Sequence, residues 1–126
     1  CCSHMPYEIC CEPLHNGQRV ASSPHALMRS RFSAFALQKA QYIHDTYAQE
    51  EREHHSVESI RRSLMGRIWT RLEITNSFVE SPTLGWVDFV AYCTVMGKEY
   101  ALREKSAFRN EKEGWCYWSA RSIQQS

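Results

Sequence analysis

The sequence lacks a hydrophobic run that approaches the roughly 20 residues of a membrane-spanning helix, and no signal-peptide pattern opens it. It also lacks an excess of basic charge, since 15 Lys and Arg face 14 Asp and Glu. Proteins that bind nucleic acid through its phosphates normally show such an excess. A Gly-rich phosphate loop and a Ser-His-Asp signature are absent as well. We therefore expect a cytoplasmic protein without a membrane partner, and a nucleic-acid partner is unexpected.

The composition that is present is that of a globular protein. Its 126 residues are 43% hydrophobic and 23% charged, close to ordinary domains. A chain of this length forms one domain with room for a small appendage, and it buries roughly two-thirds of the surface that its unfolded form exposes. Composition thus predicts a single folded core and leaves function to local features.

The six cysteines are unevenly distributed along the chain. Four of them lie within the first eleven residues: Cys1, Cys2, Cys10 and Cys11. A disulfide-stapled secreted domain spreads its cysteines through the sequence, and adjacent cysteines form strained disulfides with each other. Two cysteine pairs that flank a short loop suit a tetrahedral zinc site instead. The alternative is a set of ordinary thiols, or an oxidised pair, at the chain terminus.

Loop residues separate this Cys-rich segment from helical sequence. Residues 12–24 carry two prolines, an Asn-Gly pair and two serines, which are typical of a loop. Ser23 followed by Pro24 predicts a helix start, and apolar residues then recur at helical spacing to about Tyr47, in one helix or a broken pair. Residues 49–55 are expected to form a polar connection. A second helix is predicted over 57–66, ending at Gly66.

After Gly66 the hydrophobic period changes to two, which is typical of strands. Four β-rich stretches follow, at residues 68–79, 86–96, 98–109 and 115–123. The connections between them are short enough for antiparallel neighbours. Helices first and strands afterwards predict an α+β domain, in which the helices pack on one face of a curved four-stranded antiparallel sheet.

The segment Tyr7-Glu8-Ile9-Cys10-Cys11 resembles the end of a SEC-C motif, the short zinc knuckle of the C-terminal tail of the SecA translocase. That motif reads C-x-C-G-S, three residues, Tyr, two residues, then C-C or C-H. In this register Cys1 is the second cysteine, Cys2 stands where the family has glycine, and Ser3 matches the serine. The first cysteine of the motif falls upstream of Cys1, so we expect the natural chain to begin further upstream.

Longer stretches are similar to the YchJ family of bacterial proteins, and together they cover nearly the whole chain. They are 27–35 (LMRSRFSAF), the strand around 69–74, 104–108 (EKSAF) and 115–117 (WCY). The resemblance implies a SEC-C-like segment and linker over residues 1–23. It also implies a cystatin-like cone over residues 24–126, as in nuclear transport factor 2, where a bent sheet wraps a long helix and leaves an interior pocket. The sequence departs from the family at Ser119-Ala120, where Asp-Gly is usual, and it ends without the second SEC-C motif of some members.

For the metal site, the family register supplies Cys1, Cys10 and Cys11 as ligands. The fourth ligand is open among four candidates: the upstream cysteine, Cys2 in a shifted pose, His4 and His15. We expect structural zinc, which prefers four Cys or His ligands, over catalytic zinc, because a knuckle has no pocket around it. A segment this small has no core of its own, so metal binding and folding would be coupled.

The strand at 98–109 predicts polar groups inside the cone. Its alternation places Glu104 on an apolar face together with Tyr100. An unpaired carboxylate there is costly, so we expect Glu104 to face Arg29 or Arg31 of the first helix. Such a pair suits a general acid–base or anion-binding site, but we favour a buried structural ion pair. Asp88 is either a second polar group of the cavity or solvent-facing.

Three functions from different classes remain open at this stage. The leading one is a non-enzymatic interaction module whose zinc knuckle docks on a protein or ribosomal partner, as the resemblance implies. The second is a small-molecule binder or an enzyme that uses Glu104 with Arg29 or Arg31 inside the cone. The third is a structural domain that forms a homodimer through its sheet. A cysteine nucleophile is disfavoured because neither Cys93 nor Cys116 has a histidine nearby in the sequence.

Overall fold

A computed structural model of the protein describes residues 3–125, with side chains up to residue 121. In this part of the chain, helices precede strands, as the sequence predicts. The helices are α1 (Glu12–His15), α2 (Pro24–Ala36), α3 (Ala40–Asp45), α4 (Gln49–Arg52) and α5 (Val57–Ser63). The strands are β1 (Ile68–Ser81), β2 (Leu84–Val95), β3 (Lys98–Glu111) and β4 (Gly114–Gln125).

Helix α2 begins where the sequence predicts it and ends well before Tyr47. The Ser23 hydroxyl accepts a hydrogen bond from the Ala26 amide at 3.0 Å, and Pro24 occupies the first turn. The helix stops at Ala36, and Gln38 then adopts a left-handed backbone with φ 58°. The expected helix is therefore the broken pair, α2 and α3. The polar connection expected over 49–55 includes one helical turn, α4, whose residues are all polar.

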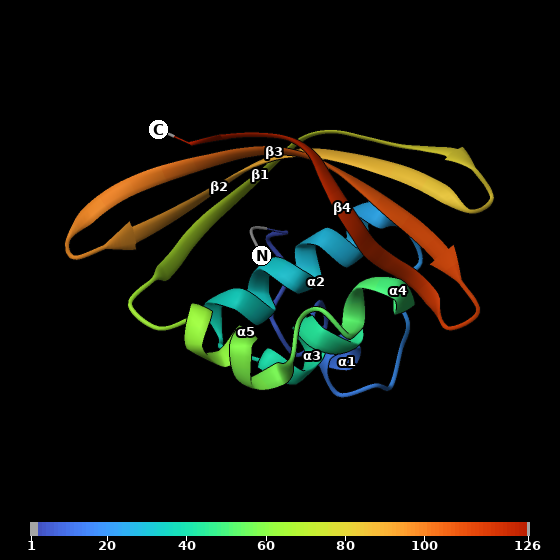
Figure 1. Ribbon diagram of the computed structural model, residues 1–126, viewed down its shortest axis with the longest axis horizontal. Coiled ribbons are helices and arrows are strands. Elements are labelled where there is room, and N and C mark those ends of the chain that lie inside the picture. Colours follow the sequence, from blue (N-terminus) through green and yellow to red (C-terminus); the bar gives the residue numbers. More distant parts are fainter. Residues whose placement is uncertain (1–2, 126) are drawn as a thin grey trace.

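The four strands form one antiparallel sheet in the order β1-β2-β3-β4. The β2–β3 turn shows why the meander is tight, since Met96 and Gly97 both have positive φ, as in a type I′ hairpin turn. Register shifts interrupt the β1–β2 pairing and the β3–β4 pairing, and such bulges bend strands. The bent sheet arches over α2, with the helices gathered on its concave side (Figure 1).

Two apolar clusters hold the layers together. The first joins α2 to the concave face of the sheet: Leu27, Met28, Phe32, Leu72, Val87, Phe89, Ala91 and Phe108. The second lies among α2, α3 and α5: Ala34, Ala40, Ile43, Ile60 and Leu64. The predicted α+β fold, with N-terminal helices on one face of a curved four-stranded antiparallel sheet, is confirmed.

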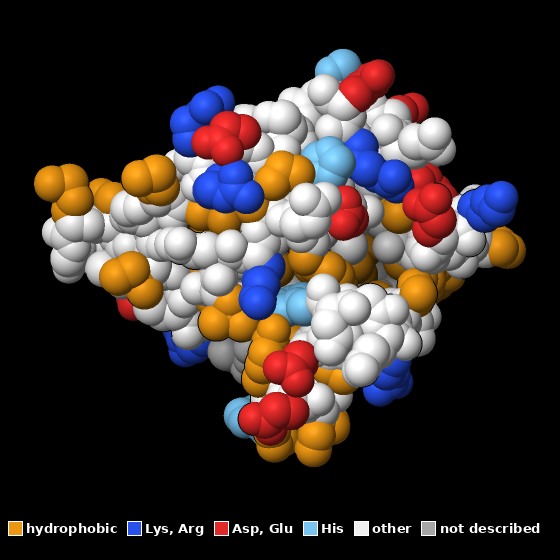
Figure 2. Space-filling view, turned by 90° about the horizontal axis from the view of Figure 1, so that it is seen from below, with side chains coloured by type: hydrophobic (Ala, Val, Ile, Leu, Met, Phe, Trp, Pro, Cys, Tyr) orange, Lys and Arg blue, Asp and Glu red, His pale blue; other side chains and the backbone are white. Residues whose placement is uncertain are grey.

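The helix-covered face carries both signs of charge. Figure 2 shows lysines and arginines interspersed with acidic side chains and histidines on this face, with hydrophobic patches between them. This mixture agrees with the near balance of acidic and basic residues in the sequence. Within the described part of the chain, no helix is both long enough and apolar enough to cross a membrane.

Candidate functional site

The N-terminal segment folds back on itself and onto helix α2. Cys10 and Cys11 are adjacent in sequence, and their sulfur atoms lie 3.6 Å apart. The Ser3 hydroxyl lies 3.2 Å from the Cys10 sulfur, which brings the start of the described chain to this cysteine. Cys11 is buried and its thiol contacts the Arg29 carbonyl at 4.0 Å. The segment is thus packed against the first turns of α2.

The two thiols fit part of a structural zinc site. Zinc–sulfur bonds of about 2.3 Å in a tetrahedron place two sulfurs roughly 3.8 Å apart, close to the spacing of Cys10 and Cys11. Cys1 and Cys2, which the sequence adds to this set, lie outside the described residues. Within residues 3–125, no three His, Cys, Asp or Glu side chains form a group that could hold a metal ion. Zinc binding therefore stays a prediction that rests on Cys10 and Cys11.

His15 is a structural link and not a ligand in this arrangement. Its Nε2 donates to the Ser30 carbonyl at 2.7 Å, so its Nδ1 accepts from the Tyr7 hydroxyl at 2.8 Å. The ring also packs against Tyr42, whose hydroxyl lies 2.7 Å from that of Ser30. Because both ring nitrogens are occupied, the suggestion of His15 as the fourth zinc ligand is wrong for this structure. The histidine instead joins the N-terminal segment to α2.

This link predicts a pH-dependent stability. Burial lowers the pKa of His15 below its ordinary 6.5, so the unfolded chain binds a proton more readily than the folded one. The contribution of neutral His15 to stability is complete above pH 6.5 and declines as the pH falls below that value toward the lower pKa of the folded state. When the pH is lowered from about 7.5 to about 5.5, we expect the urea concentration at the midpoint of unfolding to decrease. The decrease should be larger in the wild type than in His15→Gln. Exposed His54→Gln is the control and should keep the wild-type slope; equal slopes for all three proteins contradict the prediction.

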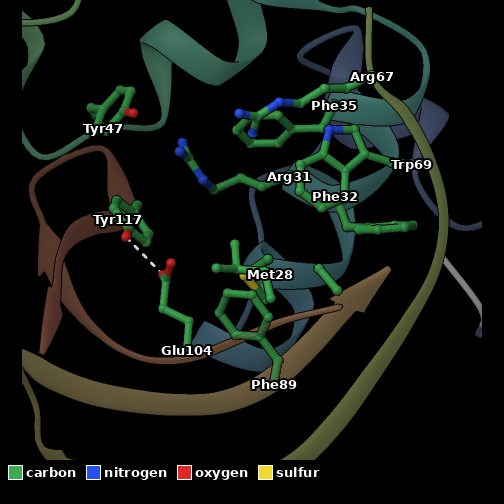
Figure 3. Close-up of a pocket in the computed structure, with 12 residues that line it drawn as sticks. Met28, Arg31, Phe32, Phe35, Tyr47, Arg67, Trp69, Phe89, Glu104 and Tyr117 are labelled. Carbon is green, nitrogen blue, oxygen red and sulfur yellow. Dashed lines mark hydrogen bonds between the residues drawn. The ribbon is translucent and has the colours of Figure 1, made fainter. Parts of the chain in front are cut away.

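The interior of the cone contains a cavity of about 210 Å³ between α2 and the sheet. Its walls are mainly aromatic and aliphatic, from Met28, Phe32, Phe35, Tyr47, Trp69, Phe89, Ala91, Leu102 and Tyr117. Its charged lining residues are Arg31, Arg67 and Glu104, from three different parts of the chain. Figure 3 shows the side chains of Arg31 and Glu104 both extending into this space. The cavity is therefore an apolar container with a few charged groups, the usual make-up of a ligand site.

Arg31 is the most unusual residue of the cavity, since only 2% of it is exposed. Its Nη1 donates to the Ile43 carbonyl at 2.9 Å and to the Thr46 hydroxyl at 2.7 Å. Its guanidinium carbon lies 4.6 Å from the ring centre of Tyr47 and 4.7 Å from that of Tyr117, within the range of cation–π attraction. The side chain is thus held rigidly between two aromatic rings.

The expected ion pair between Glu104 and Arg29 or Arg31 is wrong. Among the salt bridges of the described residues, neither arginine reaches Glu104. Ser106 and Tyr117 instead donate hydrogen bonds to Glu104 Oε2, the latter at 2.9 Å. Two hydroxyl donors therefore satisfy this carboxylate, and Tyr117 stands between the two opposite charges.

Tyr117 owes its position to a junction between β4 and the segment after α3. The Tyr117 amide donates to the Thr46 carbonyl at 2.8 Å, and the Ala48 amide donates to the Tyr117 carbonyl at 2.8 Å. This pairing places the Tyr47 and Tyr117 rings 5.7 Å apart in a nearly perpendicular arrangement on either side of Arg31. Burial, and then the Glu104 carboxylate, raise the pKa of Tyr117 far above its ordinary value. Tyr117 is therefore a neutral hydrogen-bond donor at physiological pH.

The other residues proposed for the pocket lie elsewhere. Arg29 is half-buried and does not line the cavity, because two residues along a helix turn its direction by roughly 200° from that of Arg31. Asp88 alternates with Val87 and Phe89, which face the core, so it lies on the outer face of the sheet opposite Lys105. Tyr100 lines a neighbouring cavity of about 270 Å³ that shares Arg67, Trp69 and Leu102 with the first.

Sequence reasoning missed Tyr47 and Tyr117 as cavity residues. Alternation along β4 could have placed Tyr117 on the inner face, since it lies two residues from Trp115. Tyr47 had no such signal, because it lies outside the helices and strands and reaches the site through its pairing with β4. Trp69 of β1 also lines the cavity.

The buried cysteines of the sheet are not candidates for a nucleophile. Cys93 and Cys116 are both buried. Burial raises the pKa of Cys116 to about 11, so its thiol stays protonated at neutral pH. A protonated thiol is a poor nucleophile, which agrees with the expectation from the sequence.

A bent sheet closed over a helix around an interior cavity defines an NTF2-like domain. The family model described as YchJ, middle NTF2-like domain, matches residues 23–120. The chain belongs to the YchJ family. It is 35% identical over 118 residues to UPF0225 proteins from strains of Vibrio cholerae, a match that covers 93% of this chain and 78% of those relatives.

Two solved structures share the whole arrangement. A SEC-C motif-containing protein from Rhodopseudomonas palustris matches with a TM-score of 0.90 and 32% identity, over 98% of this chain and 97% of that one. A SEC-C motif-containing protein from Psychrobacter arcticus matches with a TM-score of 0.83 and 26% identity, over 97% of this chain and 75% of that one. These likenesses include the described N-terminal segment as well as the cone.

Proposed function

We propose that the chain is a binding protein for a small organic anion, which the cavity between α2 and the sheet takes up through Arg31. The observation that carries this proposal is the hydrogen bonding of the Arg31 guanidinium. Nη1 is used by Ile43 and Thr46, whereas Nε–H and both Nη2–H donors have no partner among the described residues. These donors belong to a residue that is 98% buried and lines the cavity.

The free-energy cost of a buried charge supports an anionic ligand. A guanidinium that is 2% exposed and has no carboxylate partner loses most of its hydration, and cation–π contacts with Tyr47 and Tyr117 offset only part of that loss. Arginine presents its donors as a planar fork that matches a carboxylate or phosphate oxygen pair. Arg67, which is exposed to solvent, adds a second positive charge at the edge of the lining. An anion in the cavity would therefore supply the partner that the Arg31 fork lacks.

The volume restricts the size of the ligand. The cavity has a volume of about 210 Å³. Drug-sized ligands occupy pockets of about 300–1,000 Å³, so this one suits a smaller molecule. A monocyclic or short-chain acid fits within this volume.

The test compares an acid with its uncharged amide. We expect benzoate to bind at least about tenfold more tightly than benzamide, because only the acid pairs with the Arg31 fork. Calorimetry gives the two dissociation constants, and amide NMR shifts locate the site near Arg31 and Tyr117. Equal affinities, or shifts confined to residues outside the cavity, would overturn the proposal.

A second candidate function is a zinc-dependent interaction module at the N-terminal segment. The spacing of the Cys10 and Cys11 thiols favours it, and so do the solved neighbours, which are described as SEC-C motif proteins. Zinc would hold the segment in a fixed shape that a protein partner could recognise. Cys10 and Cys11 would supply two ligands, with the rest from residues that precede Ser3. The decisive measurement is metal content in a cysteine variant, described below.

A further inference from the structure

We infer that the anion is an aromatic carboxylate that carries a hydroxyl group, with para-hydroxybenzoate as the model compound. This inference rests on the proposed function and specifies the ligand class of the same cavity. It assigns one part of the ligand to each wall: the carboxylate to Arg31, the ring to the aromatic side chains, and the hydroxyl to Glu104. The following observations carry the last two assignments.

The aromatic side chains of the cavity wall favour a ligand that contains an aromatic ring. Trp69 meets Phe32 with ring centres 6.2 Å apart and Phe35 with ring centres 6.0 Å apart, both nearly edge to face. Such a cluster presents ring faces and edges to the cavity, and an aromatic ligand can extend it with the same geometry. In Figure 3 these rings lie around the Arg31 side chain, while Glu104 and Tyr117 enter from the sheet. A ring bound to Arg31 would therefore contact aromatic side chains.

Glu104 supplies the acceptor for a hydroxyl. Its Oε2 already accepts from Tyr117 and Ser106, and its Oε1 accepts from no described residue. The carboxylate lines the cavity, so this oxygen is available to a ligand donor. Arg31 and Glu104 line the same cavity without forming an ion pair, so a molecule in this cavity can contact both beside Tyr117.

The donor on the ligand is a neutral hydroxyl and not an ammonium group. The cavity lining carries two positive charges and one negative charge, from Arg31, Arg67 and Glu104. Arg67 is exposed to solvent, so the choice between the two donors depends on the cost of burying them and not on this sum of charges. An ammonium group would lose its hydration in this largely apolar lining, and a neutral hydroxyl costs much less to bury.

The experiment measures how much a hydroxyl adds to affinity. We expect para-hydroxybenzoate to bind wild-type protein roughly tenfold or more tightly than benzoate, since a hydrogen bond to a charged group is strong. Para-methoxybenzoate, which has no donor proton, should show no gain. In Glu104→Gln, para-hydroxybenzoate should bind only a few-fold more tightly than benzoate. In Glu99→Gln, which changes an exposed residue of the same strand, the ratio of the two affinities should stay that of the wild type. Cyclohexanecarboxylate should bind more weakly than benzoate because it lacks a π face.

The outcomes separate the two proposals. If benzoate exceeds benzamide but the hydroxyl adds nothing, this inference is wrong and the anion-binding function stands. If benzoate and benzamide bind equally, the function itself is wrong. Tighter binding of para-aminomethylbenzoate than of para-hydroxybenzoate would overturn the assignment of a neutral donor. The methoxy comparison uses wild-type protein, so it decides the question even if the Glu104 variant does not fold.

Discussion

Replacement of Arg31 by glutamine is expected to weaken the binding of benzoate by roughly 30-fold or more. Loss of one partner from a buried, hydrogen-bonded charge pair costs about 2 kcal/mol or more, and each 1.4 kcal/mol is a factor of ten in the dissociation constant. Arg31→Gln removes the cation but keeps an amide that can still donate to the Ile43 carbonyl or the Thr46 hydroxyl. Binding should therefore suffer more than folding. Calorimetry measures the affinity, and urea unfolding measures the stability.

Two further variants make this result specific to the charge and its shape. Arg31→Lys keeps the positive charge but loses the planar fork, so its affinity should lie between those of the wild type and Arg31→Gln. Thr46→Val removes one hydrogen bond of the guanidinium without removing the guanidinium, and Thr46 does not line the cavity. It should lower stability and leave affinity within a few-fold of the wild type. If Arg31→Gln binds benzoate as well as the wild type does, Arg31 is purely structural.

Replacement of Cys10 by serine is expected to abolish zinc binding. A structural zinc site contributes roughly 10–16 kcal/mol of apparent binding free energy at neutral pH, and the loss of a thiolate ligand removes much of it. We expect about one zinc per chain in wild-type protein purified without an affinity metal, and essentially none in Cys10→Ser. Elemental analysis of the purified proteins gives the ratio directly.

The matched control for the zinc measurement is Cys93→Ala. Cys93 is buried in β2, remote in sequence from the N-terminal segment, so its replacement should leave the zinc content unchanged. The cone has its own apolar clusters, so zinc removal by a chelator should leave its strand signals in circular dichroism. Wild-type protein without zinc, or with zinc that persists in Cys10→Ser, would contradict the prediction.

The part of the fold that depends on local pattern was predictable. Period-two alternation located all four strands, and Ser23-Pro24 located the start of α2. Alternation also placed Glu104, Ser106 and Phe108 on the inner face of β3, where Ser106 and Phe108 are fully buried and Glu104 lines the cavity. These features follow from the geometry of strands and helix caps, which is set by residues close together in the sequence.

The pairing of charges was not predictable in the same way. The sequence indicated an excess of apolar neighbours around Glu104 and suggested an arginine as the simplest compensation. The structure uses hydroxyl groups from Ser106 and Tyr117 instead. Tyr117 reaches Glu104 because β4 pairs with β3, and the register of that pair includes two shifts. A register with bulges depends on the whole sheet, so local sequence does not reveal which side chains meet.

The break between α2 and α3 also depends on tertiary packing and not on local sequence. The apolar residues of 24–47 have helical spacing throughout. The backbone nevertheless turns at Gln38, which is left-handed, and the Lys39 backbone amide then donates to the Ala34 carbonyl at 2.8 Å. The turn lets Ala40 and Ile43 pack with Ala34, Ile60 and Leu64 in the second apolar cluster. Burial of that cluster outweighs continuation of one helix, because helical propensity is a weak preference compared with tertiary packing.

By itself, the sequence determined the elements of this protein, their order, the face each strand turns to the core, and the cysteines available for a metal. These properties depend on the period of hydrophobic residues and on short motifs. Only the tertiary structure decided that Arg31 stands between Tyr47 and Tyr117, that Glu104 is held by Tyr117, and that donors of a buried guanidinium remain available to a ligand. Those contacts join residues far apart in the chain, and they exist because the sheet bends over α2 and β4 pairs with the segment after α3.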